Sequence, residues 1–147
     1  MSSEDKILEG IGSLLDPGER ALAAMVGRPH GWSQAIAGSM IIGAGQQQRA
    51  NDAADTAGFA LASPMALAIT DRRLLSLSMG AQVGMGLGGG VKELVGEAPL
   101  SDVDDVKVKR KLMGGQVEVT LRGEKFSIDY GAGANAKGIA EAFTSNR

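Results

Sequence analysis

The chain has 147 residues, which is the length of a single domain, and its residues are 44% hydrophobic but only 3% aromatic, so we expect a core of small side chains. It contains no cysteine, which excludes disulfides and thiolate chemistry and predicts a reducing, cytoplasmic location. Its net charge of −2 argues against a dedicated nucleic-acid binder.

The N-terminal part of the chain predicts a helix, a strand and an insertion. Apolar residues at helical spacing predict a helix within residues 1–16, and the breakers that follow end it. Residues 19–26 are predicted to form a strand that is ended by Gly27, Pro29 and Gly31. Residues 33–62 are rich in Ala, Gly and Gln and are predicted to be a helical or irregular insertion.

One face of this insertion is a candidate self-association surface, because small residues recur there at four-residue spacing. Small side chains let two helices approach closely. Packing of the same face on the domain's own sheet is the favoured alternative. The residues of this face are Ala35, Ile36, Ser39, Met40 and Gly43.

After residue 64 the hydrophobic period changes to two. Apolar and small residues alternate over 65–70 and again over 75–79, on either side of a tight polar turn. Further strands are predicted at 91–95, 103–108 and 117–130. The last of these regions is predicted to turn at Gly123-Glu124, and an extra residue at Asp104-Asp105 indicates a bulge.

A short helix ends the pattern, with Ala136, Ile139, Ala140 and Phe143 on one stripe. The order of elements predicts an α+β fold, in which a strongly bent antiparallel sheet or partly open barrel is closed by this helix. Ile139 and Phe143 are the residues expected to fill its open end.

Two segments carry a family resemblance. Residues 68–75, Ala-Ile-Thr-Asp-Arg-Arg-Leu-Leu, resemble the hairpin between the second and third strands of bacterial PH-like domains of the YokE-like kind. Residues 98–103, Ala-Pro-Leu-Ser-Asp-Val, resemble that family's proline-containing entry to the next strand. The resemblance implies a single PH-like domain over residues 1–147. The phosphoinositide site of eukaryotic relatives does not carry over, because the matching region offers only Arg28 and His30.

The candidate site for an anion or a partner is the one basic cluster in the sequence. On adjacent strands these cations would attract phosphate, anionic lipid or an acidic protein. Acidic residues are interleaved with them, so a mixed, solvated face is the favoured alternative. The cluster consists of Lys107, Lys109, Arg110, Lys111 and Arg122.

No catalytic constellation is visible, and no cofactor or metal is expected. The spacing G-x-G-x-x-G over residues 84–89 lacks the strand and helix that a dinucleotide site requires. His30 is the only histidine, and the aspartates near residue 104 lack the glycine and distal glutamate of a calcium loop.

The sequence therefore predicts a noncatalytic protein-interaction or scaffolding module that homo-oligomerises, with a protein partner of unknown identity. A sheet edge or the insertion would make the contact. The alternative is a binder of a membrane surface or of an anionic ligand through the basic cluster.

Overall fold

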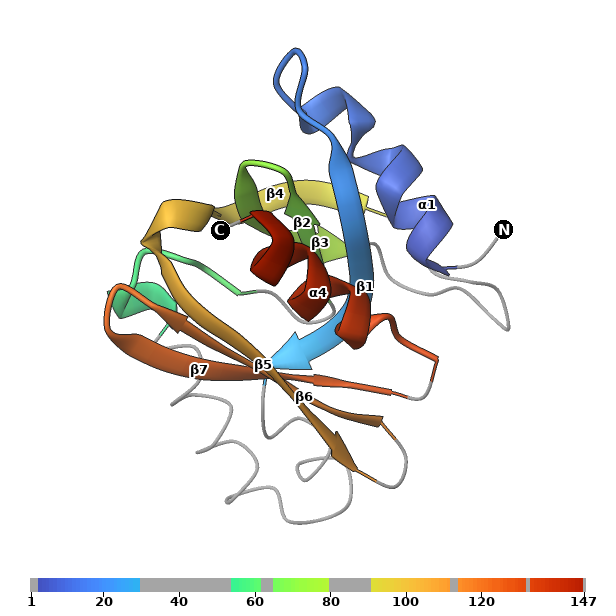
Figure 1. Ribbon diagram of the computed structural model, residues 1–147. Helices are drawn as coiled ribbons and strands as arrows, with labels where there is room; N and C mark the ends of the chain where they lie inside the picture. The colour runs from blue at the N-terminus through green and yellow to red at the C-terminus, as the bar shows by residue number, and fades with distance from the viewer. Residues whose placement is uncertain are drawn as a thin grey trace.

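The computed structural model describes residues 3–29, 54–61, 65–79, 91–111, 114–131 and 133–146. In these ranges, seven strands form one antiparallel sheet in the order β4-β3-β2-β1-β7-β6-β5, with a helix at each end of the chain (Figure 1). The elements are α1 (Ser3–Gly10), η1 (Gly12–Leu14), β1 (Ala21–Pro29), β2 (Met65–Thr70), β3 (Arg73–Met79), β4 (Val91–Pro99), η2 (Leu100–Asp102), β5 (Val103–Lys111), β6 (Gly114–Leu121), β7 (Glu124–Tyr130) and α4 (Ala136–Asn146).

The sheet bends at β1, because this strand changes its partner along its length. Residues 21–27 pair with β2, whereas only Arg28 and Pro29 pair with β7. A Cβ atom at Gly27 would lie 2.7 Å from Cγ2 of Ile128, so glycine permits the close approach of the strands there. The strand therefore runs past the predicted residue 26 and ends at Pro29, one of the residues expected to end it.

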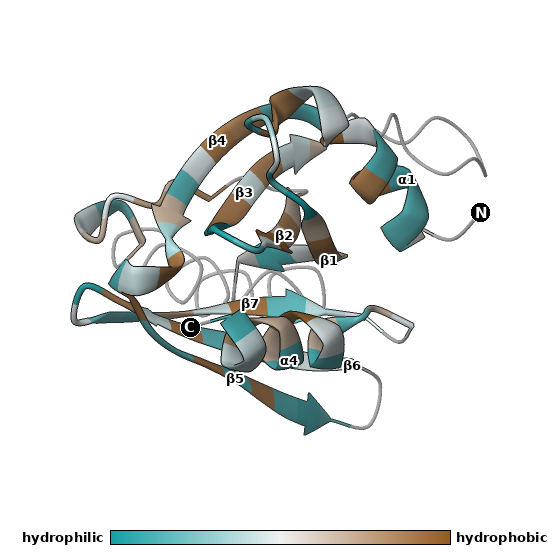
Figure 2. Ribbon diagram, turned by 45° about the horizontal axis from the view of Figure 1, so that its top comes forward, coloured by the Kyte–Doolittle hydropathy of each residue, from teal (hydrophilic) through white to brown (hydrophobic). Residues whose placement is uncertain are grey.

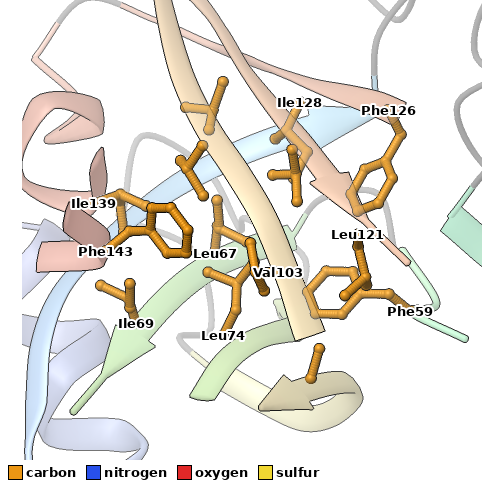
Figure 3. Close-up of a cluster of buried hydrophobic side chains, with 14 of the residues drawn as sticks. Phe59, Leu67, Ile69, Leu74, Val103, Leu121, Phe126, Ile128, Ile139 and Phe143 are labelled. Atoms are coloured by element: carbon orange, nitrogen blue, oxygen red, sulfur yellow. The ribbon is translucent and has the colours of Figure 1, made fainter. Parts of the chain in front are cut away.

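The sheet is not closed, since β4 and β5 lie at its two edges. This confirms the predicted α+β class and the predicted bent, partly open antiparallel sheet with a C-terminal helix. The inner face packs on α4, whose residues Ala136, Ile139 and Phe143 are buried. Figure 3 shows Ile139 and Phe143 beside strand residues such as Leu67, as their apolar stripe predicted.

The outer face of the first four strands is covered as well. Ile7 and Ile11, from α1 and the residue after it, pack in a second apolar cluster with Ala66, Ala68 and Leu75. Every residue of β2 is buried, so its alternation separates two cores rather than a core from solvent. The N-terminal helix is shorter than the predicted 1–16, because α1 ends at Gly10 and a separate 3-10 turn follows.

The end of the insertion belongs to the inner core. Residues 54–56 are helical, and Ala54, Ala57 and Phe59 are buried. The Phe59 ring stacks on Phe126 with 5.7 Å between ring centroids (Figure 3). Residue 59 also forms an isolated bridge to Gly96 of β4. This part of the insertion therefore covers the edge of β4.

A bulge, a strand end and a turn can each be compared with the prediction. The bulge predicted at Asp104-Asp105 is confirmed, because the pairing of β5 with β6 shifts between Val103 and Asp105. Strand β4 runs past the predicted residue 95 to Pro99. The β6–β7 turn lies one residue earlier than predicted, at Arg122-Gly123, where φ is +51° and +83°. Positive φ at both central residues is typical of a type I′ hairpin turn.

Hydrogen bonds to the Glu4 carboxylate link the two terminal helices. Glu4 of α1 accepts a hydrogen bond from the backbone N–H of Ala24 at 3.1 Å and another from Nδ2 of Asn135 at 2.5 Å. The side-chain oxygen of Asn135 accepts the N–H of Gly138 at 3.0 Å and so caps the start of α4. The position of α1 and the start of α4 are thus linked through one carboxylate.

Candidate functional site

The segment that carries the family resemblance forms a buried ion-pair network, which we call the turn-end network and which consists of Glu19, Thr70 and Arg73. The Glu19 carboxylate accepts hydrogen bonds from Nε and Nη2 of Arg73, both at 2.9 Å, and from the Thr70 hydroxyl at 2.7 Å. The Glu19 side chain is fully buried. The hydrogen bonds from Arg73 lower the pKa of Glu19 from 4.5 to about 2.

The other polar atoms of this network also have partners inside the fold. Arg73 donates to the Leu14 carbonyl at 3.0 Å and pairs with Glu97, and the Thr70 oxygen accepts the backbone N–H of Arg72. The hydrogen bonds to Glu19, with the negative charges of Glu19 and Glu97, raise the pKa of Arg73. The Thr-Asp-Arg-Arg pattern therefore serves to hold β2, β3 and the end of η1 together.

The predicted basic cluster divides into three parts. Lys107 and Lys109 lie on the outward face of β5 and pair with acids of the same sheet. Nζ of Lys107 lies 3.6 Å from Asp105, and Nζ of Lys109 lies 2.9 Å from Glu118. The hydrogen bond from Lys109 lowers the pKa of Glu118. For these two lysines the structure has the mixed, solvated face that the sequence favoured.

Arg122 lies at the other end of β5 and β6 from Arg110 and Lys111. The register pairs Val103 with Leu121, next to Arg122, whereas Lys111 pairs with Gly114. Arg122 holds Asp102 at 2.8 Å and donates to the Ala57 carbonyl at 2.5 Å. The prediction that Arg122 extends the basic cluster is wrong. Arg122 lies at the end of the β5–β6 pair that is opposite to Arg110 and Lys111, so its side chain cannot reach them.

Arg110 and Lys111 lie beside a shallow pocket of about 210 Å³ between the tip of the β5–β6 hairpin and the first turn of α4. We call this the basic pocket. Lys137, on the first turn of α4, adds a third cation. Its lining includes Arg110, Lys111, Gly114, Tyr130, Gly133 and Lys137.

Two glycines shape the wall of the basic pocket. Gly114 has a φ of +112°, and a Cβ atom there would lie 2.1 Å from the Tyr130 carbonyl oxygen. Gly133 has a φ of +90° and turns the chain from β7 toward α4. Glycine is the residue that adopts such backbone angles at little cost, so the chain can close around the pocket here.

The charges of the basic pocket are only weakly compensated. In the described part of the chain, neither Arg110 nor Lys111 has an acidic partner, and both are exposed. Lys137 lies 3.7 Å from Glu141, with both side chains at least 65% exposed. An ion pair this exposed contributes about 0–1 kcal/mol, so Lys137 is available to a competing anion. Figure 2 shows the hydrophilic end of β5 projecting from the body of the molecule.

Sequence reasoning missed Lys137 and Tyr130, although Lys137 stands at the start of a helix that the sequence did predict. The signal that could have found them is topological, since the tip of β5–β6 and the end of β7 must lie beside the start of α4. The candidate self-association face, Ala35, Ile36, Ser39, Met40 and Gly43, lies outside the described residues. His30 and the glycine pattern at 84–89 lie outside them as well.

Within the described residues, no group of three or more His, Asp or Glu side chains is placed to hold a metal ion. Nor does any helix in those ranges have the length and apolar character needed to span a bilayer.

Comparison with known proteins adds a likeness to solved structures. No family model matches the sequence, and no curated protein matches it significantly. A similar solved structure is a DUF1696 family protein with a pleckstrin-homology domain from Shewanella loihica PV-4. The likeness covers 99% of this chain and 98% of that chain, with 11% sequence identity and a TM-score of 0.49. A likeness of this degree says nothing about ligand or activity, and it gives no support to the narrower YokE-like group.

Proposed function

We propose that the protein is a noncatalytic binding module that holds an anionic group, of the phosphate class, in the basic pocket. The observation that carries this proposal is the convergence of Arg110, Lys111 and Lys137, from two separate segments, on one hollow. Membership of the YokE-like group and a cytoplasmic location remain predictions from the sequence.

The chemistry of the three cations supports a phosphate ligand. The planar guanidinium of Arg110 can donate two parallel hydrogen bonds to a phosphate, and lysine ammonium groups add compact positive charge. Tyr130 lines the same hollow. Other cations of the sheet, such as Lys109, are already paired with acids, which supports the basic pocket rather than the whole basic cluster as the site.

The size of the basic pocket supports a small ligand group rather than a whole cofactor. Its volume of about 210 Å³ lies below the roughly 300–1,000 Å³ of pockets that enclose drug-sized molecules. One anionic group would fit, with the rest of the ligand outside. That group could belong to a soluble phosphorylated molecule or to a lipid headgroup, because both present the same chemistry to the three cations.

Two binding measurements distinguish these sources. The first titrates inorganic phosphate into the protein, and the second sediments the protein with phosphatidylserine-containing vesicles at low and high salt. Phosphate binding without vesicle binding indicates a soluble ligand. Vesicle binding that salt abolishes indicates a membrane surface. Absence of both would overturn the proposal.

Matched variants test whether the basic pocket is the site. We expect Arg110→Ala/Lys111→Ala, and separately Lys137→Glu, to weaken binding at least about tenfold, because the first removes two charged hydrogen-bond donors and the second removes one, each worth roughly 1.5–3 kcal/mol. The control is Lys125→Ala, which removes an exposed cation whose partner is Glu118. An equal loss in the control would show non-specific attraction and contradict the proposal.

A further inference from the structure

Glu4 of α1 occupies a gap beside β1. Among the described strands, β2 pairs with residues 21–27 on one side, but β7 reaches only Arg28 and Pro29 on the other. The Glu4 carboxylate fills part of this gap, because it accepts the N–H of Ala24 at 3.1 Å. Both α1 and α4 contact β1 (Figure 1). A helix of eight residues is marginal on its own, so contacts such as this one fix where α1 lies.

The same carboxylate holds the residue at the start of α4. It accepts a hydrogen bond from Nδ2 of Asn135 at 2.5 Å, and the side-chain oxygen of Asn135 accepts the N–H of Gly138 at 3.0 Å. Glycine at position 138 makes room for this amide, since a Cβ atom there would lie 2.4 Å from Nδ2 of Asn135. Each end of the Asn135 amide therefore has a partner, one in α1 and one in α4.

Asn135 stands in the middle of one wall of the basic pocket. The two residues before it and the two after it line the hollow, and the second of those after it is Lys137. The opposite wall is the tip of the β5–β6 hairpin, which strand pairing holds in place. The chain reaches Asn135 through Gly131 and Gly133, and glycines give a connection little stiffness of its own. The position of Lys137 relative to Arg110 therefore depends on what anchors the start of α4.

We propose that Glu4 is a positioning residue of the basic pocket: through Asn135 it fixes the start of α4, and with it Lys137, so that docking of α1 and binding of an anion favour each other. This inference rests on the proposed function and adds an effect of the pocket on the N-terminal helix. Glu4 does not line the pocket and acts only through Asn135. Because coupling between two sites is reciprocal, an anion that holds Lys137 in place also strengthens the contact of Asn135 with Glu4.

The sign of one substitution separates positioning from simple attraction between charges. Glu4 is an acid behind a wall of a cationic pocket, so loss of its charge alone would strengthen anion binding. Positioning predicts the opposite, and we expect Glu4→Ala to weaken the binding of inorganic phosphate at least about fivefold. Glu141→Ala is the matched control. It removes an acid that pairs with Lys137 only at the surface, at 3.7 Å, and it should not weaken phosphate binding.

Asn135→Ser breaks the same link from the other side without a change of charge. Serine still caps a helix, but its shorter side chain cannot span the distance to Glu4 that the asparagine amide covers. We expect a loss of phosphate affinity similar to that of Glu4→Ala. The double variant Glu4→Ala/Asn135→Ser should lose no more than the larger single loss, because both substitutions break one link. Losses that multiply in the double variant would overturn the link.

Hydrogen exchange of the Ala24 amide tests the coupling in the reverse direction. Saturating phosphate should slow this exchange at least about fivefold in the wild type, because the acceptor of the amide, Glu4, is then held more firmly. In Asn135→Ser, saturating phosphate should leave the exchange rate of Ala24 unchanged. Slowing that persists in Asn135→Ser would show only the general stabilisation of a fold by its ligand, and it would overturn the coupling.

The outcomes keep this inference apart from the proposed function. Absence of phosphate binding in the wild type overturns both. Phosphate binding that Lys137→Glu abolishes, but that is as tight or tighter in Glu4→Ala, overturns the positioning role alone. Thermal unfolding shows whether each variant is folded at the temperature of the titration. If Glu4→Ala is not folded there, Asn135→Ser, which keeps the helix cap, decides the outcome.

Discussion

Two sets of charged side chains differ in whether the fold neutralises them. Beside the β2–β3 turn Glu19 holds Arg73, and beside the β6–β7 turn Asp102 holds Arg122. At the tip of the β5–β6 hairpin, Arg110 and Lys111 have no acidic partner among the described residues, and Lys137 nearby has only an exposed one. A charge whose partners lie in its own fold stabilises that fold, whereas a weakly compensated cluster beside a hollow is available to a ligand.

The largest expected effect is on the turn-end network. Arg73→Ala leaves the Glu19 carboxylate buried without its cation, and breaking a buried pair in this way costs about 3–5 kcal/mol. Urea denaturation measures the change in the free energy of unfolding. Arg72→Ala, at an exposed neighbouring position, is the control and should change it by less than about 0.5 kcal/mol. Equal effects would show that Arg73 has no special structural role.

Acid should reveal the same network. The pKa of Glu19 lies near 2 in the folded protein against 4.5 for an unperturbed glutamate, so its contribution is complete above about pH 4.5 and is lost as the pH falls toward 2. The contribution is on the order of 3 kcal/mol. In Glu19→Gln the loss of stability between these pH values should be smaller than in the wild type. An unchanged slope would contradict the assignment.

Substitution of two glycines compares the β6–β7 turn, which contains Gly123, with the tip of the β5–β6 hairpin, which contains Gly114. At Gly123, φ is +83° and a Cβ atom would meet nothing within 4 Å, so Gly123→Ala should cost about 1 kcal/mol of backbone strain alone. At Gly114 a Cβ atom would meet the Tyr130 carbonyl at 2.1 Å, so Gly114→Ala should cost more and should also weaken phosphate binding. Thermal unfolding and phosphate titration measure both effects. Equal losses of stability would contradict the packing around the basic pocket.

The smallest expected effect has the opposite sign. The Ser76 hydroxyl in β3 is buried and has no hydrogen-bond partner in the described part of the chain. Replacing an unsatisfied buried hydroxyl removes a desolvation penalty of about 1–3 kcal/mol, offset in part by the small void left behind. We therefore expect Ser76→Ala to raise the melting temperature by at most a few degrees. A lowered melting temperature would mean that the hydroxyl does have a partner.

Local patterns predicted most of the fold. Alternation over residues 65–70, the bulge near Asp104 and the stripe of Ile139 and Phe143 each follow from the period of one element, and the structure confirms them. The β6–β7 turn lies one residue earlier than the pattern predicts, because Arg122 adopts a positive φ as well as Gly123.

Long-range partners could not be predicted in this way. Glu19 and Arg73 are 54 positions apart, and neither residue alone indicates that the other neutralises it. The basic pocket depends on the approach of Lys137 to Arg110 and Lys111, which only the packing of α4 on the sheet brings about. The sequence cluster therefore contained two of the three cations of the pocket and three residues that pair elsewhere.

The most direct test of the central claim follows backbone amide resonances while inorganic phosphate is added to the wild-type protein. We predict saturable shifts at Gly114, Gly131 and Lys137 around the basic pocket, with Gly123 in the β6–β7 turn unchanged. Shifts at Gly123 as large as those at the basic pocket, or none at the basic pocket, would contradict the account.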